Sequence, residues 1–578
     1  MNKKAKIFLA VLSAGCAAVC LFVCLPPVRS FIVSLLERAL HRGLNRNYWS
    51  QQIFAFSAIV LLFNICMIFF VFTRKGRSFY LELSSDIRAK SGIFRENKKY
   101  ILFLFILFSF GLISIFRADF YNVANDDLFR EITGERAWRN FYRYVSEFGS
   151  IIVHMSPKLL DIAPLTQFIA VLIMAASAFV LIYSCTDSKV TVFSCIASIP
   201  VCLFPYFLSD ISYRYDSPYM ALSVFFSVVP FLFTGNLLTY AFISVTGLFL
   251  MCLSYQASSG IYIFCTVIFA LKFWTEGKKT DKQILKFTGV SVLCYLGALF
   301  LFSKLFIEKP DHEIYVDTAV SVSSFIPNCK TYLSLVWKDF GHSAIKLFSV
   351  LILICFTVLE IKHSRKNKLL TAALIITGIA FSLIFSYGSY LALKKPLWLP
   401  RAFIGIGVFT GLVSIMVSRF FSEKDRKHIF AKIVVSALSY SVLVFAFAFG
   451  NAQAAQKEYR NFRTTMLISE LSRLVPASGK TVEIHFTNAV GTAAAALQLI
   501  RAYPLAAKCI NGDLGPGQSG ELVLSQHNFG TIDYSKTAPL PDKELPVLSD
   551  TLYETIRGTN SVFVVTFREP DCRIAGEH

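Results

Sequence analysis

The chain has 578 residues, of which 55% are hydrophobic and 16% are charged, and its mean hydropathy is +0.57. A soluble domain carries about 25% charged residues, so this composition excludes a disordered chain, a small disulfide-stabilised secreted protein and an ordinary cytosolic enzyme. The net charge of +20 would suit a nucleic-acid-binding protein, but the positions of the charges, described below, argue against that class. The composition is that of a membrane protein with many spans.

Apolar runs long enough to cross a bilayer recur along most of the chain. A helix needs about 20 apolar residues to cross the hydrocarbon core. Gly235 and Asn236 separate two of these runs and predict a tight turn between helices. We predict thirteen spans, near residues 6–28, 51–73, 100–116, 164–184, 190–208, 217–234, 236–254, 257–274, 287–307, 345–361, 369–391, 402–418 and 429–449.

Clusters of Lys and Arg give the orientation of these spans. Short cytoplasmic loops accumulate basic residues because Lys and Arg resist translocation. With the N-terminus in the cytoplasm, the thirteen spans place four basic clusters on the cytoplasmic side: Arg74–Lys99, Lys272–Lys286, Lys362–Lys368 and Arg419–Lys432. The basic segment 29–46 falls on the outer side, where we expect an interfacial amphipathic helix. The positive charge therefore indicates a cytoplasmic membrane face.

Three domains are predicted. Residues 1–99 form a membrane hairpin and a basic cytoplasmic segment, residues 100–450 form a membrane domain with long outer loops at 117–163 and 308–344, and residues 451–578 form a small α/β domain on the outer face. In the last domain we expect a helix from Gln453 to about Val475, a strand at 481–486, a helix over 489–502 and a strand at 561–567. Most of the 14 cysteines lie in apolar spans, but Cys509 and Cys572 lie in the outer tail and would pair in an oxidising compartment.

The sequence Asn125-Asp126-Asp127-Leu128-Phe129-Arg130 follows the third span. Two adjacent carboxylates at a membrane surface suit general base catalysis or the binding of a hydroxyl group or a metal. The same residues also suit the start of a helix. In that interpretation Asn125 is the N-cap, the two acids stabilise the first turn, and Arg130 pairs with them three or four residues on.

Three further outer segments carry polar residues. Residues 209–218 offer two carboxylates, Arg214 and the ring of Tyr215, which suit sugar binding, or else form an interfacial aromatic belt. Residues 254–260 either line a cavity or make a tight hairpin. Residues 394–401 place three cations outside, where they would meet an anionic group or ordinary headgroups.

Several chemistries have no support in the sequence. His312 and His342 lack the spacing of metal ligands. No phosphate-binding loop, dinucleotide fingerprint, nucleophile elbow or CxxC pair occurs, so neither ATP-driven nor nicotinamide chemistry is indicated.

The order of these motifs resembles the GtrII family of membrane glucosyltransferases, which modify bacterial O-antigen. The similarity covers roughly residues 95–475, and the N-terminal hairpin departs from the compact family pattern. It rests on four motifs in order on the outer face: Asn125-Asp126-Asp127 with Arg130, Tyr215-Asp216-Ser217, Tyr255-Gln256-Ala257-Ser258, and Gly450-Asn451-Ala452-Gln453.

The resemblance implies a fold and a reaction. The fold would be mainly α, a GT-C-like polytopic helix bundle of the bacterial inner membrane, with its C-terminal α/β domain in the periplasm. The donor would be a glucose carried on undecaprenyl phosphate, and the acceptor a lipid-linked or surface polysaccharide. A lipid-sugar synthase and a flippase would be functional partners. A divalent metal, Mg²⁺ or Mn²⁺, is left open as a cofactor.

The resemblance also implies roles for residues. Asp126 and Asp127 would be the catalytic pair of an inverting transfer, in which one of them deprotonates the acceptor hydroxyl. Asp216, Tyr255 and Gln256, together with the ring of Tyr215, would contact the sugar. We add Arg130, Arg214 and Arg401 as phosphate partners because of their charge and their outer position.

Two alternatives remain at this point. A flippase or transporter of lipid-linked sugars would place ionisable residues at the bilayer midplane, whereas the carboxylates here gather at one surface. A polymerase of surface polysaccharide would share the substrate class, and only its product would distinguish it.

Overall fold

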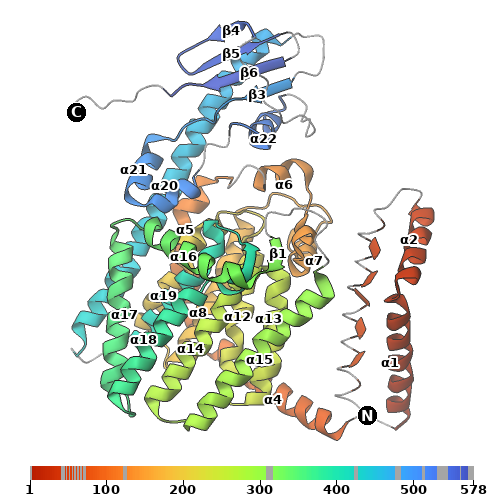
Figure 1. Ribbon diagram of the computed structural model, residues 1–578, viewed down its shortest axis with the longest axis vertical. Coiled ribbons are helices and arrows are strands. Elements are labelled where there is room, and N and C mark those ends of the chain that lie inside the picture. Colours follow the sequence, from red (N-terminus) through yellow and green to blue (C-terminus); the bar gives the residue numbers. More distant parts are fainter. Residues whose placement is uncertain are drawn as a thin grey trace.

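A computed structural model describes residues 3–40, 73–121, 126–307, 317–421, 427–475, 483–510, 514–529, 545–559 and 562–569, with scattered positions between 46 and 68. The chain is mainly helical (Figure 1). Asn125, His312, Cys572 and most of the predicted span 51–73 lie outside the described residues. The pairing of Cys509 with Cys572 therefore stays a prediction.

Nine helices in the described part of the chain are long and apolar enough to cross a membrane. Large apolar side chains such as Leu102, Leu293 and Leu369 are exposed on their outward faces, as expected for helices that face lipid rather than water. The nine are α5 (Lys98–Ala118), α8 (Leu165–Cys185), α13 (Leu237–Ser254), α14 (Ser259–Glu276) preceded by η3 (Gln256–Ser258), α15 (Asp281–Phe306), α17 (Ala344–His363), α18 (Lys368–Phe385), α19 (Ile404–Ser418) preceded by η5 (Pro400–Phe403), and α20 (Ile429–Leu474).

The predicted count of thirteen spans is not reproduced. The span predicted at 190–208 is broken into α9 (Val192–Ala197), α10 (Ile199–Leu203) and α11 (Pro205–Ile211), with a bend of 63°. Pro205 disfavours helical geometry at Phe204, whose backbone is extended (φ −62°, ψ 141°). The described residues give nine spans, or up to eleven if each of two bent pairs is one span.

The other differences also involve proline. The span predicted at 6–28 is α1 (Lys3–Val23), which turns by 87° at Pro26 into α2 (Pro26–Leu40). The run predicted at 217–234 is α12 (Ser217–Val228) followed by η2 (Val229–Phe233), a helix shorter than the candidate spans. The predicted turn after it is present, since the Asn236 side chain caps the start of α13.

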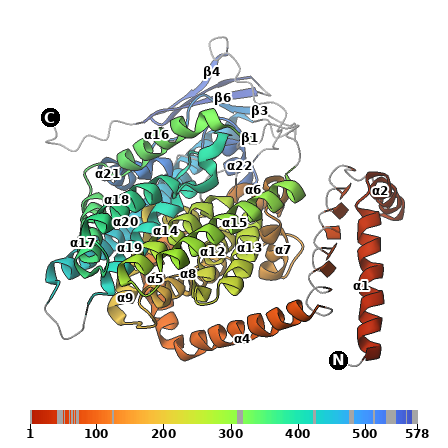
Figure 2. The ribbon, with the colours of Figure 1, turned by 60° about the horizontal axis from the view of Figure 1, so that its bottom comes forward.

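All four basic clusters lie at one end of the bundle, which we call the basic end. Here α4 (Arg74–Glu96) lies across the lower end of the bundle, where it contacts α5 and α13 (Figures 1 and 2). Glu82 and Asp86 of α4 accept hydrogen bonds from Asn236 at 2.6 and 3.1 Å, and Lys366 pairs with Asp281 at 2.8 Å. The charge pattern therefore gave the correct grouping of these loops.

The opposite end, which we call the sheet end, carries the segments predicted to lie outside (Figure 1). Its two short strands, β1 and β2, pair antiparallel, with Asp317 opposite Lys395. The short elements here are α6 (Asp127–Thr133), η1 (Trp138–Phe141), α7 (Tyr144–His154), β1 (Asp317–Val320), α16 (Val322–Asp339), η4 (Gly388–Ala392) and β2 (Leu393–Lys395).

Helix α20 joins the bundle to a C-terminal sheet. It runs for 46 residues without a break, so the last predicted span and the first predicted helix of the tail form one helix. The sheet has the order β3-β6-β5-β4, with β3 parallel to β6 and the other pairs antiparallel. Its elements are β3 (Glu483–Phe486), α21 (Ala494–Ala502), η6 (Pro504–Lys508), α22 (Gln518–Gln526), β4 (Val547–Asp550), β5 (Glu554–Gly558) and β6 (Val562–Phe567). The strands predicted at 481–486 and 561–567 are present as β3 and β6, whereas the helix predicted from 489 begins at Ala494.

The sheet region packs on both α20 and α6. The buried guanidinium of Arg463 on α20 donates to the carbonyl oxygens of Tyr553 (2.6 Å) and Arg568 (3.0 Å). Leu128 of α6 lies in the same apolar cluster as Leu522 and Phe563. The C-terminal region thereby holds the helix that begins at Asp127.

Candidate active site

The two adjacent acids of the first motif have different surroundings. Asp126 directly precedes α6, and its Oδ2 accepts a hydrogen bond from Arg401 Nη1 at 2.9 Å, while its side chain stays 35% exposed. Asp127 is fully buried, and its Oδ2 accepts the backbone N–H of Arg214 at 3.4 Å. The Asp126 side chain makes no capping bond to α6. A substrate can therefore contact Asp126 but not the buried Asp127 as the structure stands.

These surroundings move the two pKa values in opposite directions. Burial opposes ionisation of Asp126, but the guanidinium groups of Arg401, Arg130 and Arg143 outweigh it and hold the pKa of Asp126 below its usual range. Burial and then the neighbouring Asp216 carboxylate raise the pKa of Asp127 well above its usual range. Environments that separate the pKa values of two neighbouring acids are typical of catalytic sites.

Asp216 lies at the start of α12 and is bound on both carboxylate oxygens. Arg130 donates to Oδ2, and the indole N–H of Trp138 donates to Oδ1. The Arg130 guanidinium also lies over the Trp138 ring, 4.2 Å from its centroid. In the helix-start interpretation Arg130 would pair with Asp126 and Asp127, but its ion pair in the structure is with Asp216.

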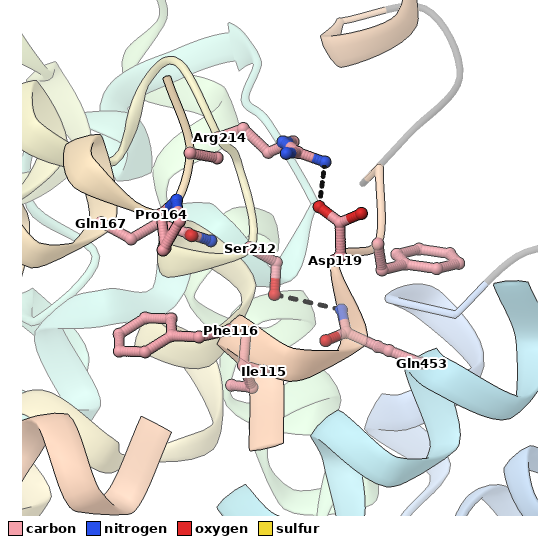
Figure 3. A pocket seen from close by; sticks show the side chains of 10 residues that line it. Ile115, Phe116, Asp119, Pro164, Gln167, Ser212, Arg214 and Gln453 are labelled. Atoms are coloured by element: carbon pink, nitrogen blue, oxygen red, sulfur yellow. Dashed lines mark hydrogen bonds and ion pairs between the residues drawn. The ribbon is translucent and has the colours of Figure 1, made fainter. Parts of the chain in front are cut away.

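Arg214 joins three segments at the sheet end. It pairs with Asp119 at 2.7 Å and Asp161 at 3.0 Å, and Lys457 of α20 also pairs with Asp119 at 2.6 Å. Figure 3 shows Arg214 directed at Asp119, next to a polar cavity of about 20 Å³ where Gln453 donates to Ser212. That volume suits a water molecule and not a sugar.

The third motif lies next to Arg401. The Tyr255 hydroxyl donates to the Arg401 carbonyl at 3.1 Å, and the Gln256 amide donates to the Phe141 carbonyl at 2.9 Å. The Gln256 carbonyl oxygen accepts from Arg143 Nε at 3.2 Å. The predicted hairpin is thus a tight turn, and the side chains of Tyr255 and Gln256 form hydrogen bonds with other segments of the chain.

Glycines allow this close packing. An added Cβ at Gly405 would lie 2.1 Å from the Ser386 carbonyl oxygen, and one at Gly260 would lie 2.4 Å from the same atom. Helices α14 and α19 therefore both pack closely against the backbone of Ser386, the residue that follows α18.

The side chain of Tyr215 packs among aromatic and apolar neighbours. Its buried ring stacks on His154, with 6.0 Å between centroids, and packs in a small apolar cluster with Trp138, Leu159 and Tyr219. The cations of residues 394–401 also separate, because Lys394 and Lys395 are exposed while Arg401 turns toward Asp126.

Sequence reasoning gave no individual role to two residues of this site, although Asp210 lies in the segment 209–218 that it selected. Asp210 on α11 is fully buried, and neither carboxylate oxygen has a hydrogen-bond partner in the described chain. Arg143 lies between Gln256 and the ring of Tyr255, with its guanidinium 4.6 Å from the ring centroid. The signal for Asp210 was its place in the apolar run 205–211, since an acid at membrane depth is costly. Arg143 carried no such signal in a loop with several other bases.

A protein metal site requires several donor side chains close together. Among the described residues, no three His, Cys, Asp or Glu side chains come together in a way that could hold a metal ion. The cations near Asp126 are arginines of the chain itself.

These features define a polytopic membrane protein with a candidate active site at one end of its helix bundle. Comparison with known families matches residues 113–418, about half of the chain, to the family described as glucosyl transferase GtrII. The chain belongs to this family, so glycosyl transfer is the activity its membership implies.

One curated relative supports this assignment. An uncharacterised 55.3 kDa protein from the gtrB 5′ region of Salmonella phage P22 is 24% identical over 448 residues, which cover 73% of this chain and 87% of that protein. No solved structure matches the chain.

Proposed function

We propose that this chain is an inner-membrane glucosyltransferase that moves glucose from a polyprenyl-phosphate carrier to a lipid-linked or surface polysaccharide. The reaction takes place at the sheet end, which lies in the periplasm. The positive-inside rule supports this orientation, because the four basic clusters lie together at the opposite end.

One observation carries the proposal. Asp126 is a carboxylate with a lowered pKa and 35% of its side chain exposed, and it lies beside Arg401 where a substrate can reach it. Asp126 therefore suits the general base better than Asp127, because a base must first lie within hydrogen-bond reach of its proton. Asp127 instead positions the backbone at Arg214.

The proposed reaction is a single displacement. Asp126 takes the proton of the acceptor hydroxyl, and the hydroxyl oxygen forms a bond to the anomeric carbon. The bond from that carbon to the phosphate oxygen breaks, and its electron pair leaves with the polyprenyl phosphate. Because one bond forms as the other breaks, the configuration at this carbon inverts. We expect a GT-C-like fold for the bundle.

The remaining site residues receive supporting roles. Arg130 and Arg214 each have a carboxylate partner, so their predicted contact with phosphate would require these pairs to open. We assign Arg130, Trp138, Tyr215 and Asp216 to holding the loop at 211–217 in place. Tyr255 positions Arg401 through its carbonyl group.

The test compares Asp126→Asn with the same substitution at an exposed acid of the basic end. Asp281, whose side chain is 65% exposed, provides the matched control. Membranes containing each variant receive polyprenyl-phosphate-[¹⁴C]glucose and acceptor glycan. Loss of a general base should lower the transfer rate about 10² to 10⁴-fold in Asp126→Asn, whereas Asp281→Asn keeps the wild-type rate.

Three results would contradict the proposal. Full transfer by a correctly inserted Asp126→Asn variant would remove the catalytic assignment. Movement of labelled lipid-sugar across liposomes by the purified protein, without transfer, would make it a flippase. A product extended by repeating units would make it a polymerase.

A further inference from the structure

A large apolar cavity lies beside Arg143 at the sheet end. Its volume is about 530 Å³, within the range of ligand pockets and many times the ~30 Å³ of one liquid water. Its walls come from α14, α15, α16, α18, η4 and the segment 140–143. The apolar lining includes Leu299, Ile307, Phe325, Phe385 and Leu391.

The cavity reaches the outward face of α15. Leu296 and Phe300 line it, and both are more than half exposed, at 57% and 60%. The outward face of this candidate span would contact lipid, so a hydrocarbon chain can enter the cavity sideways from the bilayer. Water has little to bind along these walls.

The lining of the cavity also includes polar side chains. Arg143 is the charged residue among the described residues that line it, and Gln256 lies next to it. Arg130, Arg214 and Arg401 each pair with a carboxylate, but Arg143 has no carboxylate within 4.0 Å in the described chain. Because no carboxylate contacts this largely buried cation directly, an anion bound to it would be stabilised.

Arg143 is also connected to the candidate base. Its guanidinium lies over the Tyr255 ring, whose hydroxyl donates to the carbonyl of Arg401, and Arg401 pairs with Asp126. Two residues, Tyr255 and Arg401, therefore connect a group bound at Arg143 to the acid that we assign to proton transfer.

We infer that this cavity binds the hydrocarbon chain of an isoprenoid phosphate and that Arg143 and Gln256 bind its phosphate group. The inference rests on the proposed function, in which this lipid is the donor carrier. The apolar walls exclude water from the chain, and Arg143 stabilises the negative charge that grows on the phosphate as the sugar leaves. A phospholipid offers similar chemistry, and the experiment separates the two.

Binding is measured without transfer, by native mass spectrometry of the full chain in zwitterionic nanodiscs, with undecaprenyl phosphate as the probe. Arg143→Gln should weaken binding about tenfold or more through loss of a charge-assisted contact, and Arg139→Gln, at a neighbouring exposed arginine, provides the control and should leave binding unchanged. Leu299→Trp fills the cavity and should also weaken binding. A thermal melt of each variant checks that it is folded.

Each outcome decides a separate question. Unchanged binding in folded Arg143→Gln and Leu299→Trp would overturn the inference, even if transfer is lost. Equal competition by phosphatidylglycerol would also overturn it, since the site would then be a general lipid site. Binding that depends on Arg143 in a protein that transfers no glucose would support the cavity assignment and remove the proposed function.

Discussion

Buried charges gather at both ends of the helix bundle, but the two clusters differ in completeness. At the basic end Lys272 pairs with Asp187 at 2.5 Å, and Arg419 pairs with Glu276 at 2.8 Å and Glu360 at 2.7 Å. Each acid there has a cation, and Glu360 also accepts a hydrogen bond from Thr275 at 2.8 Å. This cluster joins the loops after α8, α14, α17 and α19.

The cluster at the sheet end is open by comparison, in the sense that some of its charged groups have no direct ionic partner in the described chain. Asp126 is partly exposed, Asp127 lies beside another carboxylate, Asp210 has no hydrogen-bond partner in the described chain, and Arg143 has no carboxylate partner there. A closed ion-pair network stabilises loops, whereas an open one keeps charge available for a ligand. This difference supports the proposal that the reaction takes place at the sheet end.

The largest expected effect comes from removing Arg401, the cation that pairs with Asp126. Arg401→Gln should lower transfer about 10² to 10³-fold, because a preorganised charge next to the reacting groups is lost. It should also move the acid limb of the pH–rate profile. Arg401 lowers the pKa of Asp126, so without it the base becomes protonated at a higher pH and activity is lost earlier as the pH falls.

Lys272→Gln provides the control at the basic end. This variant also loses an ion pair with a buried cation, but it should keep the wild-type acid limb because Lys272 lies near the end of α14 at the basic end, whereas Asp126 directly precedes α6 at the sheet end. An acid limb that moves equally in both variants would mean that the profile reports general instability.

An intermediate effect is expected from removing an acid of the ion-pair cluster at the basic end. Glu360→Gln removes one of the two carboxylates that pair with Arg419 and should lower the free energy of unfolding by about 2 kcal/mol, since a buried charged donor loses a charged partner. Transfer per folded molecule should not change. Thermal unfolding in detergent, together with the transfer assay, checks both statements, and a loss of transfer beyond the loss of folded protein would show that the two ends are coupled.

The smallest effect concerns Asp127. Its pKa is raised in the folded chain, so the folded state holds the proton more tightly than the unfolded chain does. Wild-type stability should therefore fall as the pH rises from about 4 toward the raised pKa. Asn cannot ionise, so the melting temperature of Asp127→Asn relative to wild type should increase across this interval.

Melting curves in detergent at several pH values measure this difference. Asp281→Asn, at an exposed acid, should show a constant difference from wild type. A constant difference for Asp127→Asn as well would mean that the pKa of Asp127 is the same in the folded and the unfolded chain.

The sequence allowed most of the long helices to be predicted, because about 20 apolar residues between charged loops are sufficient evidence for a span. It failed where proline interrupts an apolar run, as at Pro205 and Pro26, because hydropathy does not register a bend. It also separated the last span from the helix after Gly450, although α20 continues through it. The change from apolar to polar residues after Gly450 suggested that the helix ends there, but only the polarity of its surroundings changes.

The site was predicted only in part. The motif at 125–130 identified the acid pair, but adjacent positions gave no indication that one acid would be buried and the other exposed. Arg130 and Asp216 are 86 residues apart, and Arg401 and Asp126 are 275 apart. Such pairs cannot be assigned from local spacing.

The sequence alone determined that this is a membrane protein, which of its loops share a side, and which family it resembles, because hydrophobic length and charge are local properties of the chain. Only the tertiary structure decided which arginine neutralises which acid and which cation lies at an apolar cavity. Those choices depend on distances between segments far apart in the sequence, and burial then changes the strength of every charge that meets there.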